Sequence, residues 1–185
     1  MKKPNFLFIG ADRCGSKSMH NVLNQHPNCY VPAIADPYFF DKKYDRGFKW
    51  YHNFFKNTSD IHIAIGELSH DYIHSKLAAK RIYDYNPDIK LIITLRNPID
   101  RTYSSYASAY SAGVINESFE NAIDNVPMLI ENSLYADKLD YYLSIFKKEQ
   151  IKILLFDDLV SDPILFYKDL FIFLKLPFIE NINYK

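Results

Sequence analysis

Four short apolar runs recur along the chain, and segments with helical periodicity separate them. Continuous apolar strands of this kind are typical of a sheet that is buried on both faces. We therefore predict a parallel sheet covered by helices on both sides, which is an α/β fold with three layers, α/β/α. The predicted strands are Phe6–Ile9, Ile61–Ile65, Leu91–Leu95 and Ile151–Phe156, with a weaker candidate at Cys29–Val31.

Five segments carry apolar side chains at helical spacing, and several begin at a recognisable cap. Asn97-Pro98 and Asp162-Pro163 are typical of a cap residue followed by a first-turn proline. The predicted helices are 16–25, 75–85, 97–110, a segment capped by Ser133 that carries Leu139, Tyr142, Leu143 and Phe146, and one opened by Asp162 that carries Phe166, Leu170, Phe173 and Leu174.

Composition narrows the class of protein further. The 185 residues suit one domain, 1–185, with 22 basic and 22 acidic side chains. This balance argues against a general nucleic-acid coat, and no apolar run is long enough to span a bilayer. Two cysteines make no disulfide framework. We expect a cytoplasmic protein without a nucleic-acid or membrane partner, and the oligomeric state stays open.

The first strand runs into a glycine-containing loop, "GADRCG", and then into a helix. Backbone N–H groups at such a helix start can bind a phosphate. A nucleoside-triphosphate loop needs Lys directly after the second glycine, followed by Ser or Thr. Here Ser16 takes that place and Lys17 comes one residue late, which rotates its side chain by about 100°. An ordinary strand-to-helix turn is the alternative interpretation.

A second motif, "LRNPIDRTYSSY", follows a strand in the same way. Arg96 leaves the strand just before a helix, and Ser104 lies two helical turns into it, so spacing alone does not assure contact between them. Both can converge on a second phosphate if the sheet edge and the helix flank the same crevice. A kinase needs an acidic residue after a strand to hold magnesium, and Asp157 is the candidate for that role. The alternatives are a surface ion pair for Arg96 and a helix-face hydroxyl for Ser104.

Together the two motifs resemble those of the sulfotransferases that use 3′-phosphoadenosine 5′-phosphosulfate (PAPS). "IGADRCGSKSM" is similar to the family's 5′-phosphosulfate loop, and "LRNPIDRTYSSY" to its 3′-phosphate motif. "ADPYFFDKKYDRGFKWYHNFF", "GELSHDYI" and "SLYADKLDYYLSIFKKEQIKILLFDDLVSDP" resemble, in order, segments of the glycan sulfotransferase branch. The resemblance implies a P-loop-like sulfotransferase fold, PAPS as donor, adenosine 3′,5′-bisphosphate (PAP) as product and no required metal.

The resemblance also implies roles for individual residues. Asp36 matches the family's catalytic Glu but is one methylene shorter, and with Pro37 next to it a helix cap is equally plausible. Glu67 and His70 are reserve bases, and Arg13 matches the cation at the leaving phosphate. The implied donor-binding residues are Arg13, Cys14, Gly15, Ser16, Lys17, Ser18, Arg96 and Ser104, with Arg101 as a further 3′-phosphate candidate.

The resemblance implies two residues on the acceptor side, and a histidine pair in the same region suggests a metal site. Asp41 and Trp50 are the substrate-binding candidates, with aromatic packing as the alternative for Trp50. His70 and His74 at i and i+4 suggest a metal pair, but the sequence shows no third ligand and no HExxH pattern, so we expect no metal site.

The favoured function is sulfuryl transfer from PAPS to a hydroxyl or amine of a small-molecule or glycan acceptor, such as a carbohydrate. The alternatives are a P-loop nucleotide or small-molecule kinase and a nucleotide-binding protein with reduced turnover. Family members usually continue into a basic, glycine-containing loop over the nucleotide, and the sequence reaches Lys185 without one. We therefore expect a more open nucleotide site with weaker, salt-sensitive affinity.

Overall fold

The computed structural model describes residues 2–184 and is built around a five-stranded sheet. Every pair of neighbouring strands is parallel, and the strand order is β2-β3-β1-β4-β5. This confirms the predicted α/β class. The strands are β1 (Phe6–Gly10), β2 (Cys29–Tyr30), β3 (Ala64–Leu68), β4 (Lys90–Leu95) and β5 (Ile151–Leu155).

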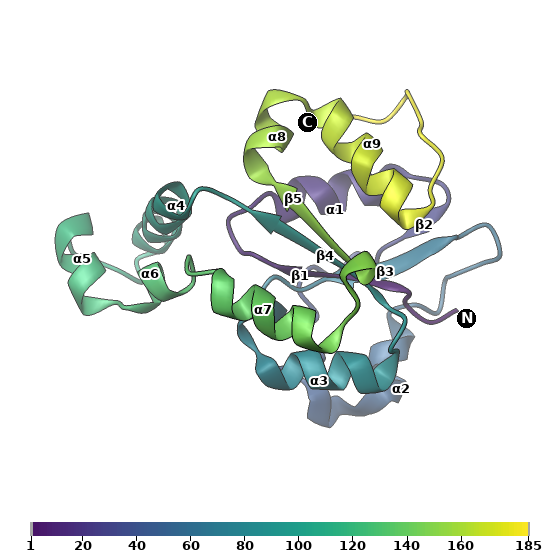
Figure 1. Ribbon diagram of the computed structural model, residues 1–185, viewed down its shortest axis with the longest axis horizontal. Coiled ribbons are helices and arrows are strands. Elements are labelled where there is room, and N and C mark those ends of the chain that lie inside the picture. The colour runs from purple at the N-terminus through teal and green to yellow at the C-terminus, as the bar shows by residue number, and fades with distance from the viewer. Residues whose placement is uncertain (1, 185) are drawn as a thin grey trace.

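Helices cover both faces of this sheet, and a third group extends away from it (Figure 1). One face carries α1 (Ser16–Gln25), α8 (Phe156–Ser161) and α9 (Pro163–Leu174), and the other carries α2 (Gly47–Asn53), α3 (Lys76–Tyr85) and α7 (Ala136–Ile145). Beyond the carboxyl end of β4 lie α4 (Pro98–Ser111), α5 (Phe119–Asn125) and α6 (Met128–Glu131). Short 3-10 turns span Tyr44–Arg46, Tyr72–His74 (η2) and Lys148–Gln150.

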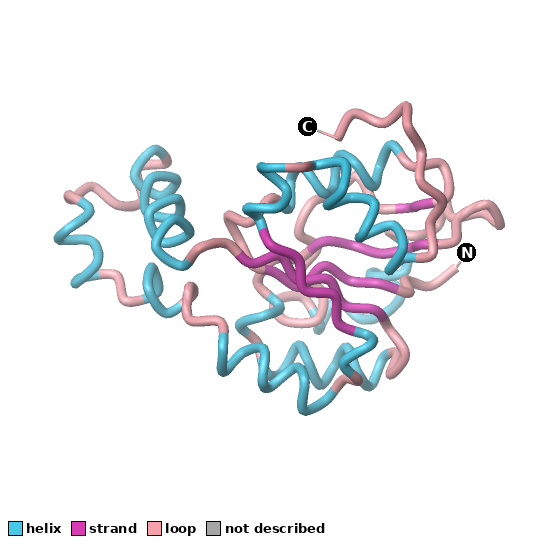
Figure 2. Tube along the Cα trace, turned by 45° about the horizontal axis from the view of Figure 1, so that its top comes forward, coloured by secondary structure: helices cyan, strands magenta, loops and turns pink. Residues whose placement is uncertain are grey.

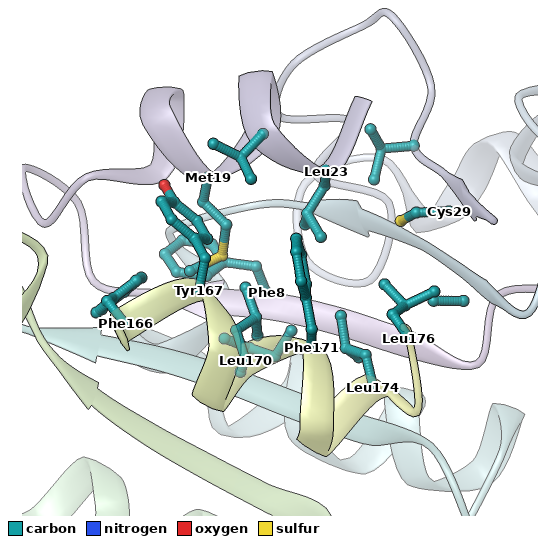
Figure 3. Close-up of a cluster of buried hydrophobic side chains, with 14 of the residues drawn as sticks. Phe8, Met19, Leu23, Cys29, Phe166, Tyr167, Leu170, Phe171, Leu174 and Leu176 are labelled. Atoms are coloured by element: carbon teal, nitrogen blue, oxygen red, sulfur yellow. The ribbon is translucent and has the colours of Figure 1, made fainter. Parts of the chain in front are cut away.

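Alternation along β1 divides the core into two layers, because successive side chains of a strand point to opposite faces. Phe8 packs with Met19 of α1 and Phe171 of α9 (Figure 3). Leu7 joins the cluster on the opposite face, which includes Ile82 of α3. Each fully buried side chain of this size contributes roughly 1.5–3 kcal/mol. The trace in Figure 2 shows the sheet between these two helical layers.

The third strand begins three residues later than the apolar pattern predicts. β3 starts at Ala64, which pairs with Cys29 of β2. Ile61 and Ile63 precede the pairing and are 60% and 48% exposed. Glu67, which we expected to follow the strand, therefore lies inside it. The apolar run predicted the wrong start because hydrophobicity alone does not show where hydrogen bonding to the neighbouring strand begins.

Two other boundaries also differ from the predictions. Ser133 does not cap α7, whose cap position is Tyr135; the Ser133 hydroxyl is buried and accepts a hydrogen bond from Arg101. Phe156 begins α8 rather than ending β5. By contrast, Asn97 and Asp162 accept backbone hydrogen bonds at the starts of α4 and α9, as predicted.

The topology places a binding crevice at one edge of the sheet. β1 lies between β3 and β4, so the chain crosses over on both sides of it, and ligands of open parallel sheets bind at such a switch point, outside the carboxyl ends of the strands. The loops after β1, β3 and β4 all meet there.

Among residues 2–184, no helix is both long and apolar enough to cross a membrane. Cys14 and Cys29 are buried and form no disulfide.

Candidate active site

The loop between β1 and α1 is shaped to receive an anion. Gly15 precedes α1 with φ of 88°, and a Cβ there would lie 2.7 Å from Leu159 Cδ2, so only glycine suits this position. In the described structure no side chain caps α1, and its first turn carries no acidic residue. The first amides of α1 are therefore free to bind a phosphate, which the helix dipole also favours. The Ala11 N–H donates to the Thr94 carbonyl at 3.0 Å and so ties the loop to β4.

Side chains from both predicted phosphate motifs meet beside this loop. Arg13 Nε donates to Ser104 Oγ at 3.2 Å, which joins the loop to α4. Arg96 Nη1 donates to the Arg13 carbonyl at 3.4 Å, and its guanidinium lies over the Phe156 ring, 4.8 Å from the centroid. Spacing in the sequence did not assure this convergence. The fold brings two cations and a hydroxyl together where a phosphate-rich ligand would be bound.

Arg101, a further candidate for the 3′-phosphate, is not available to a ligand. Its side chain is completely buried, and Nη2 lies 2.5 Å from Asp12 Oδ1. Nη1 donates to the Leu129 carbonyl at 3.0 Å and to Ser133 Oγ at 3.2 Å. Arg101 therefore fastens the phosphate loop to α4 and α6 and does not bind phosphate.

Asp36 and His70 form a hydrogen-bonded pair across the crevice. Asp36 Oδ1 lies 2.7 Å from His70 Nδ1 and accepts the His70 backbone N–H at 3.3 Å. Residues 33–41 contain no helix, so the helix-cap interpretation of Asp36 is wrong. Tyr38 Oη lies 3.0 Å from His70 Nε2, and Asp71 Oδ1 lies 3.4 Å from the same nitrogen.

The two side chains shift each other's ionisation. Burial works against the charged form of Asp36, but the hydrogen bond and charge of His70 outweigh it and lower the Asp36 pKa. Burial likewise disfavours charged His70, but the hydrogen bond and charge of Asp36, with help from Asp71 and Asp12, raise the His70 pKa. Because an ionised carboxylate can only accept, Nδ1 carries a proton, and Nε2 is the nitrogen that can gain one.

Backbone conformation marks the same place. Among the described residues, four that are not glycine have positive φ, and three of them are Arg13 at 61°, Asp36 at 53° and Tyr38 at 52°. Such conformations cost of order 1–3 kcal/mol each and persist where surrounding contacts enforce them. Their clustering at one crevice supports a functional role for these loops.

Glu67 lies next to this pair but does not open onto the crevice. Its side chain is fully buried, with Ser69 Oγ and Tyr72 Oη each 2.8 Å from a carboxyl oxygen. Burial raises its pKa to about 8, although the two hydroxyls work in the opposite direction. A group enclosed in this way cannot take a proton directly from an acceptor, so the reserve-base interpretation does not fit its position.

The remaining predicted donor contacts divide between the loop and the core. Ser16 and Lys17 line the crevice, Lys17 with an exposed side chain. The Cys14 thiol is buried and lies 3.3 Å from the Asp12 carbonyl, and burial raises its pKa to about 11, so Cys14 can contact a donor only through its backbone. Ser18 Oγ pairs with Tyr167 Oη at 2.9 Å, on the side of α9.

The two predicted acceptor-binding residues lie farther along the chain from Asp36. Asp41 Oδ1 accepts the Lys42 backbone N–H at 2.5 Å, and burial raises the Asp41 pKa. Trp50 lies in α2, where its ring packs edge-on against Phe54 with 4.7 Å between centroids. The Trp50 ring therefore packs against another aromatic ring, as the alternative interpretation of this residue proposed.

Two adjoining cavities connect these groups. One, of about 390 Å³, is lined by Arg13, Ser16, Asp36 and His70, together with residues of α4. The other, of about 470 Å³, is lined by Ser16, Lys17 and Asp36, and extends along α1. Because Ser16 and Asp36 line both, the phosphate loop and the Asp36–His70 pair face one continuous crevice. Within residues 2–184, no cluster of three His, Cys, Asp or Glu side chains could hold a metal ion.

Sequence reasoning did not single out Tyr38 and Asp71, although both contact His70. Tyr38 lies inside the quoted segment "ADPYFFD", and Asp71 directly follows His70. Their contacts with Nε2 depend on the turn after β3, which sequence spacing does not specify. The adjacent His-Asp dipeptide was the one signal available for Asp71.

The comparisons with known proteins agree with this geometry. The family model described as "Sulfotransferase domain" matches residues 3–183. The chain belongs to the sulfotransferase family. Human "Heparan sulfate glucosamine 3-O-sulfotransferase 6" is 32% identical over 169 residues, which is 86% of this chain and 48% of the relative. The chain thus spans about half the length of the curated relatives it matches.

Solved sulfotransferase structures show the same fold. A sulfotransferase from Alicyclobacillus acidocaldarius superposes with a TM-score of 0.87 at 29% identity, covering 96% of this chain and 83% of that one. Mouse sulfotransferase SULT7A1, solved in complex with PAP, gives a TM-score of 0.65 at 10% identity, covering 97% and 62% of the two chains. At the latter identity the likeness concerns the fold alone.

Proposed function

We propose that this member of the sulfotransferase family transfers a sulfuryl group from PAPS to a hydroxyl of a carbohydrate. One observation carries the proposal: Arg13, Ser16, Asp36 and His70 line a single cavity. A leaving-group cation, a phosphate-binding hydroxyl and a proton acceptor are what this transfer requires in one place. Family membership supports PAPS as the donor, as do the contacts of Arg13 with Ser104 and of Arg96 with the Arg13 carbonyl.

In the proposed reaction, the acceptor oxygen attacks the sulfur of PAPS as the bond between sulfur and the bridging phosphate oxygen breaks. The products are a sulfate ester and PAP. Arg13, with the amides at the start of α1, stabilises the negative charge that develops on the departing phosphate oxygen. Because the charge of Arg13 is in place before the reaction, it lowers the barrier without reorganisation of solvent.

The proton of the acceptor hydroxyl goes to the Asp36–His70 pair. Asp36 holds Nδ1–H of His70 at 2.7 Å, which leaves the Nε2 lone pair as the proton acceptor. In the structure, Tyr38 Oη lies 3.0 Å from Nε2. When the acceptor binds, its hydroxyl replaces the Tyr38 hydroxyl as the hydrogen-bond partner of Nε2. Positioned bases of this kind contribute about 10²–10⁴-fold to rate.

The carbohydrate acceptor is proposed from the relatives. Several of them carry the name "Heparan sulfate glucosamine 3-O-sulfotransferase", including the human 3B1 form at 31% identity. Those proteins act on glucosamine units by name, and the segment from Asp36 to Phe55 resembles the glycan branch. A glucosamine-containing oligosaccharide is therefore the first acceptor to test.

A kinase function is less well supported by the positions of the charged groups. Asp157, the candidate magnesium ligand, lies exposed in the first turn of α8. β4 ends next to Arg96, a cation, where a metal-binding carboxylate would be needed. These placements suit a ligand with a second phosphate group rather than a metal-bound triphosphate.

The test compares two ligands and then measures transfer. In calorimetry without metal, PAP should bind, and ATP with Mg²⁺ should bind much more weakly. Radiolabelled PAPS should then transfer its sulfuryl group to glucosamine-containing oligosaccharides. Magnesium-dependent ATP binding with no PAP binding would overturn the proposal in favour of a kinase. PAP binding without transfer to any saccharide or small-molecule hydroxyl would instead indicate a nucleotide-binding protein with reduced turnover.

A further inference from the structure

Glu67 is a buried carboxyl whose contacts call for an explanation. It lies in β3 beside β1, in register with Leu7, and its side chain has no exposed surface. The hydrogen bonds that the structure gives it come from hydroxyls, Ser69 Oγ to Oε2 and Tyr72 Oη to Oε1, each at 2.8 Å. Burying a carboxyl among neutral groups is costly, so a role that requires this position is expected.

Both hydroxyls continue to the segment that carries Asp36. The Tyr38 N–H donates to Ser69 Oγ at 3.0 Å, and the Phe40 N–H donates to Tyr72 Oη at 3.2 Å. A hydroxyl has one proton to donate and lone pairs that accept, so each one links the carboxyl to a backbone amide. Two parallel two-bond relays therefore run from Glu67 to residues 38 and 40.

The relays act on strained backbone. Asp36 and Tyr38 have φ of 53° and 52°, a region that side-chain-bearing residues leave unless contacts enforce it. The Asp36 N–H also donates to the Leu68 carbonyl at 3.1 Å, next to Glu67 in β3. Three amides of residues 36–40 are thus tied to β3 and the turn that follows it.

We propose that Glu67 is a positioning residue that, through Ser69 and Tyr72, holds the segment Asp36–Phe40 so that Asp36 meets His70. This inference rests on the proposed function for the importance of that pair, but not for the relays themselves. In this proposal Glu67 is not a base, and its role in the reaction is to hold other residues in position. The carboxyl acts on the backbone of the segment, and Asp36 and His70 act on the acceptor.

The test reads the Asp36–His70 contact directly, by following the titration of His70 with labelled histidine in NMR, assigned with His70→Asn. The groups that face the His70 ring are Asp36, Asp71, Asp12 and Tyr38. Ser69→Ala and Tyr72→Phe each break one relay. In both variants the His70 pKa should fall toward the ordinary value of 6.5, because Asp36 no longer stays at hydrogen-bond distance.

Tyr142→Phe is the matched control. Tyr142 is a neighbouring buried tyrosine whose hydroxyl donates to the Tyr72 carbonyl at 2.7 Å, outside the relays. This variant removes a buried hydrogen bond of the same kind, so thermal unfolding should show a similar loss of stability. Its His70 titration should remain that of the unmodified protein.

Glu67→Gln separates positioning from proton transfer. Glutamine keeps the shape of the side chain and offers an acceptor and a donor to the two hydroxyls, so both relays persist. It should keep the His70 titration and retain sulfuryl transfer within about 10-fold, whereas loss of a general base costs about 10²–10⁴-fold. Glu67→Met should lower the His70 pKa and reduce kcat while PAP affinity stays unchanged.

An unchanged His70 titration in folded Ser69→Ala and Tyr72→Phe would overturn the inference. So would a Glu67→Gln variant that loses transfer while its His70 titration is normal, since that result would make Glu67 a proton-transfer group. If Tyr72→Phe fails to fold, Ser69→Ala and Glu67→Gln still decide the question. Absence of transfer in the unmodified protein would count against the proposed function alone, because the titration is measured without turnover.

Discussion

The two sides of the crevice are built in different ways. On the donor side, the Arg13 side chain is exposed and contacts Ser104. The Arg96 side chain contacts the backbone carbonyl of Arg13. On the acceptor side, the Asp36 and His70 side chains are 30% and 24% exposed. The Asp36 N–H donates to the Leu68 carbonyl in β3, and the Tyr38 N–H donates to Ser69 Oγ just after β3. The donor side thus rests on contacts made by long side chains, whereas the acceptor side is held by several hydrogen bonds to β3 and the turn after it.

This contrast separates affinity from turnover. Charge-assisted hydrogen bonds to phosphate are strong, so in the proposed reaction Arg13 and Arg96 chiefly determine how tightly the nucleotide binds. A preorganised acid–base pair adds little to donor binding but lowers the barrier of the chemical step. Variants on the two sides should therefore change different measured quantities.

The largest effect is expected from Asp36→Asn. Asparagine keeps the shape but removes the charge that fixes the tautomer of His70, so kcat for sulfuryl transfer should fall by about 10²–10⁴-fold. PAP affinity in calorimetry should stay unchanged, because Asp36 acts on the acceptor side. Asp71→Asn is the matched control: its carboxylate also faces His70 but at 3.4 Å, and its loss should cost far less.

Arg13→Ala is the counterpart on the donor side. It should reduce both PAP affinity and kcat, since in the proposed reaction Arg13 contacts the leaving phosphate before and during transfer. If Arg13→Ala and Asp36→Asn changed affinity and kcat in the same proportions, the division between the two sides would be wrong.

A smaller effect is expected from Arg96→Ala. Loss of one charge-assisted contact to the 3′-phosphate should weaken PAP binding by about 1.5–3 kcal/mol. Binding of adenosine 5′-phosphate, which lacks that group, should hardly change. Calorimetry with both nucleotides provides the comparison, and equal losses for the two would contradict the assignment of Arg96 to the 3′-phosphate.

The smallest effect concerns the pH dependence of stability. The His70 pKa is raised above 6.5, so its stabilising contribution is complete below that pH and is lost as pH rises through the raised value. The Asp36 pKa is lowered below 3.8, so its contribution is present above that pH and is lost as pH falls through the lowered value. The Asp36–His70 pair should therefore stabilise the fold most between pH 3.8 and pH 6.5.

Urea unfolding of the unmodified protein and of His70→Asn, carried out from acid to alkaline pH, measures the stabilising contribution of the pair. The difference in the free energy of unfolding should be largest between pH 3.8 and pH 6.5 and should shrink toward alkaline pH as His70 loses its proton. Glu67, whose pKa is raised by burial, is present in both proteins and largely cancels in the difference. A difference that grows with pH would show that the two side chains are not coupled in the folded state.

Local pattern was enough to predict the parts of this protein that depend on neighbours in the chain. The strands around Phe8 and Ile92 follow from runs of apolar residues, and the helix that begins at Ser16 follows from the spacing of its apolar residues. The helix that begins at Pro98 follows from the Asn97 cap, which acts within one turn. The spacing of Gly10 and Gly15 likewise predicted the loop between the first strand and the first helix, and phosphate binding by this loop stays a prediction. The order of residues in five motifs predicted the family, which the comparisons confirmed.

Only the tertiary structure decided which polar side chains meet and which are enclosed. Arg101 and Glu67 look equally suited to a ligand in the sequence, yet both are fully buried, one against Asp12 and the other between two hydroxyls. Asp36 and His70 are 34 residues apart and come within 2.7 Å through the parallel pairing of the sheet. Burial and such contacts depend on strand register and on packing between layers, which are non-local quantities that no short window of sequence contains.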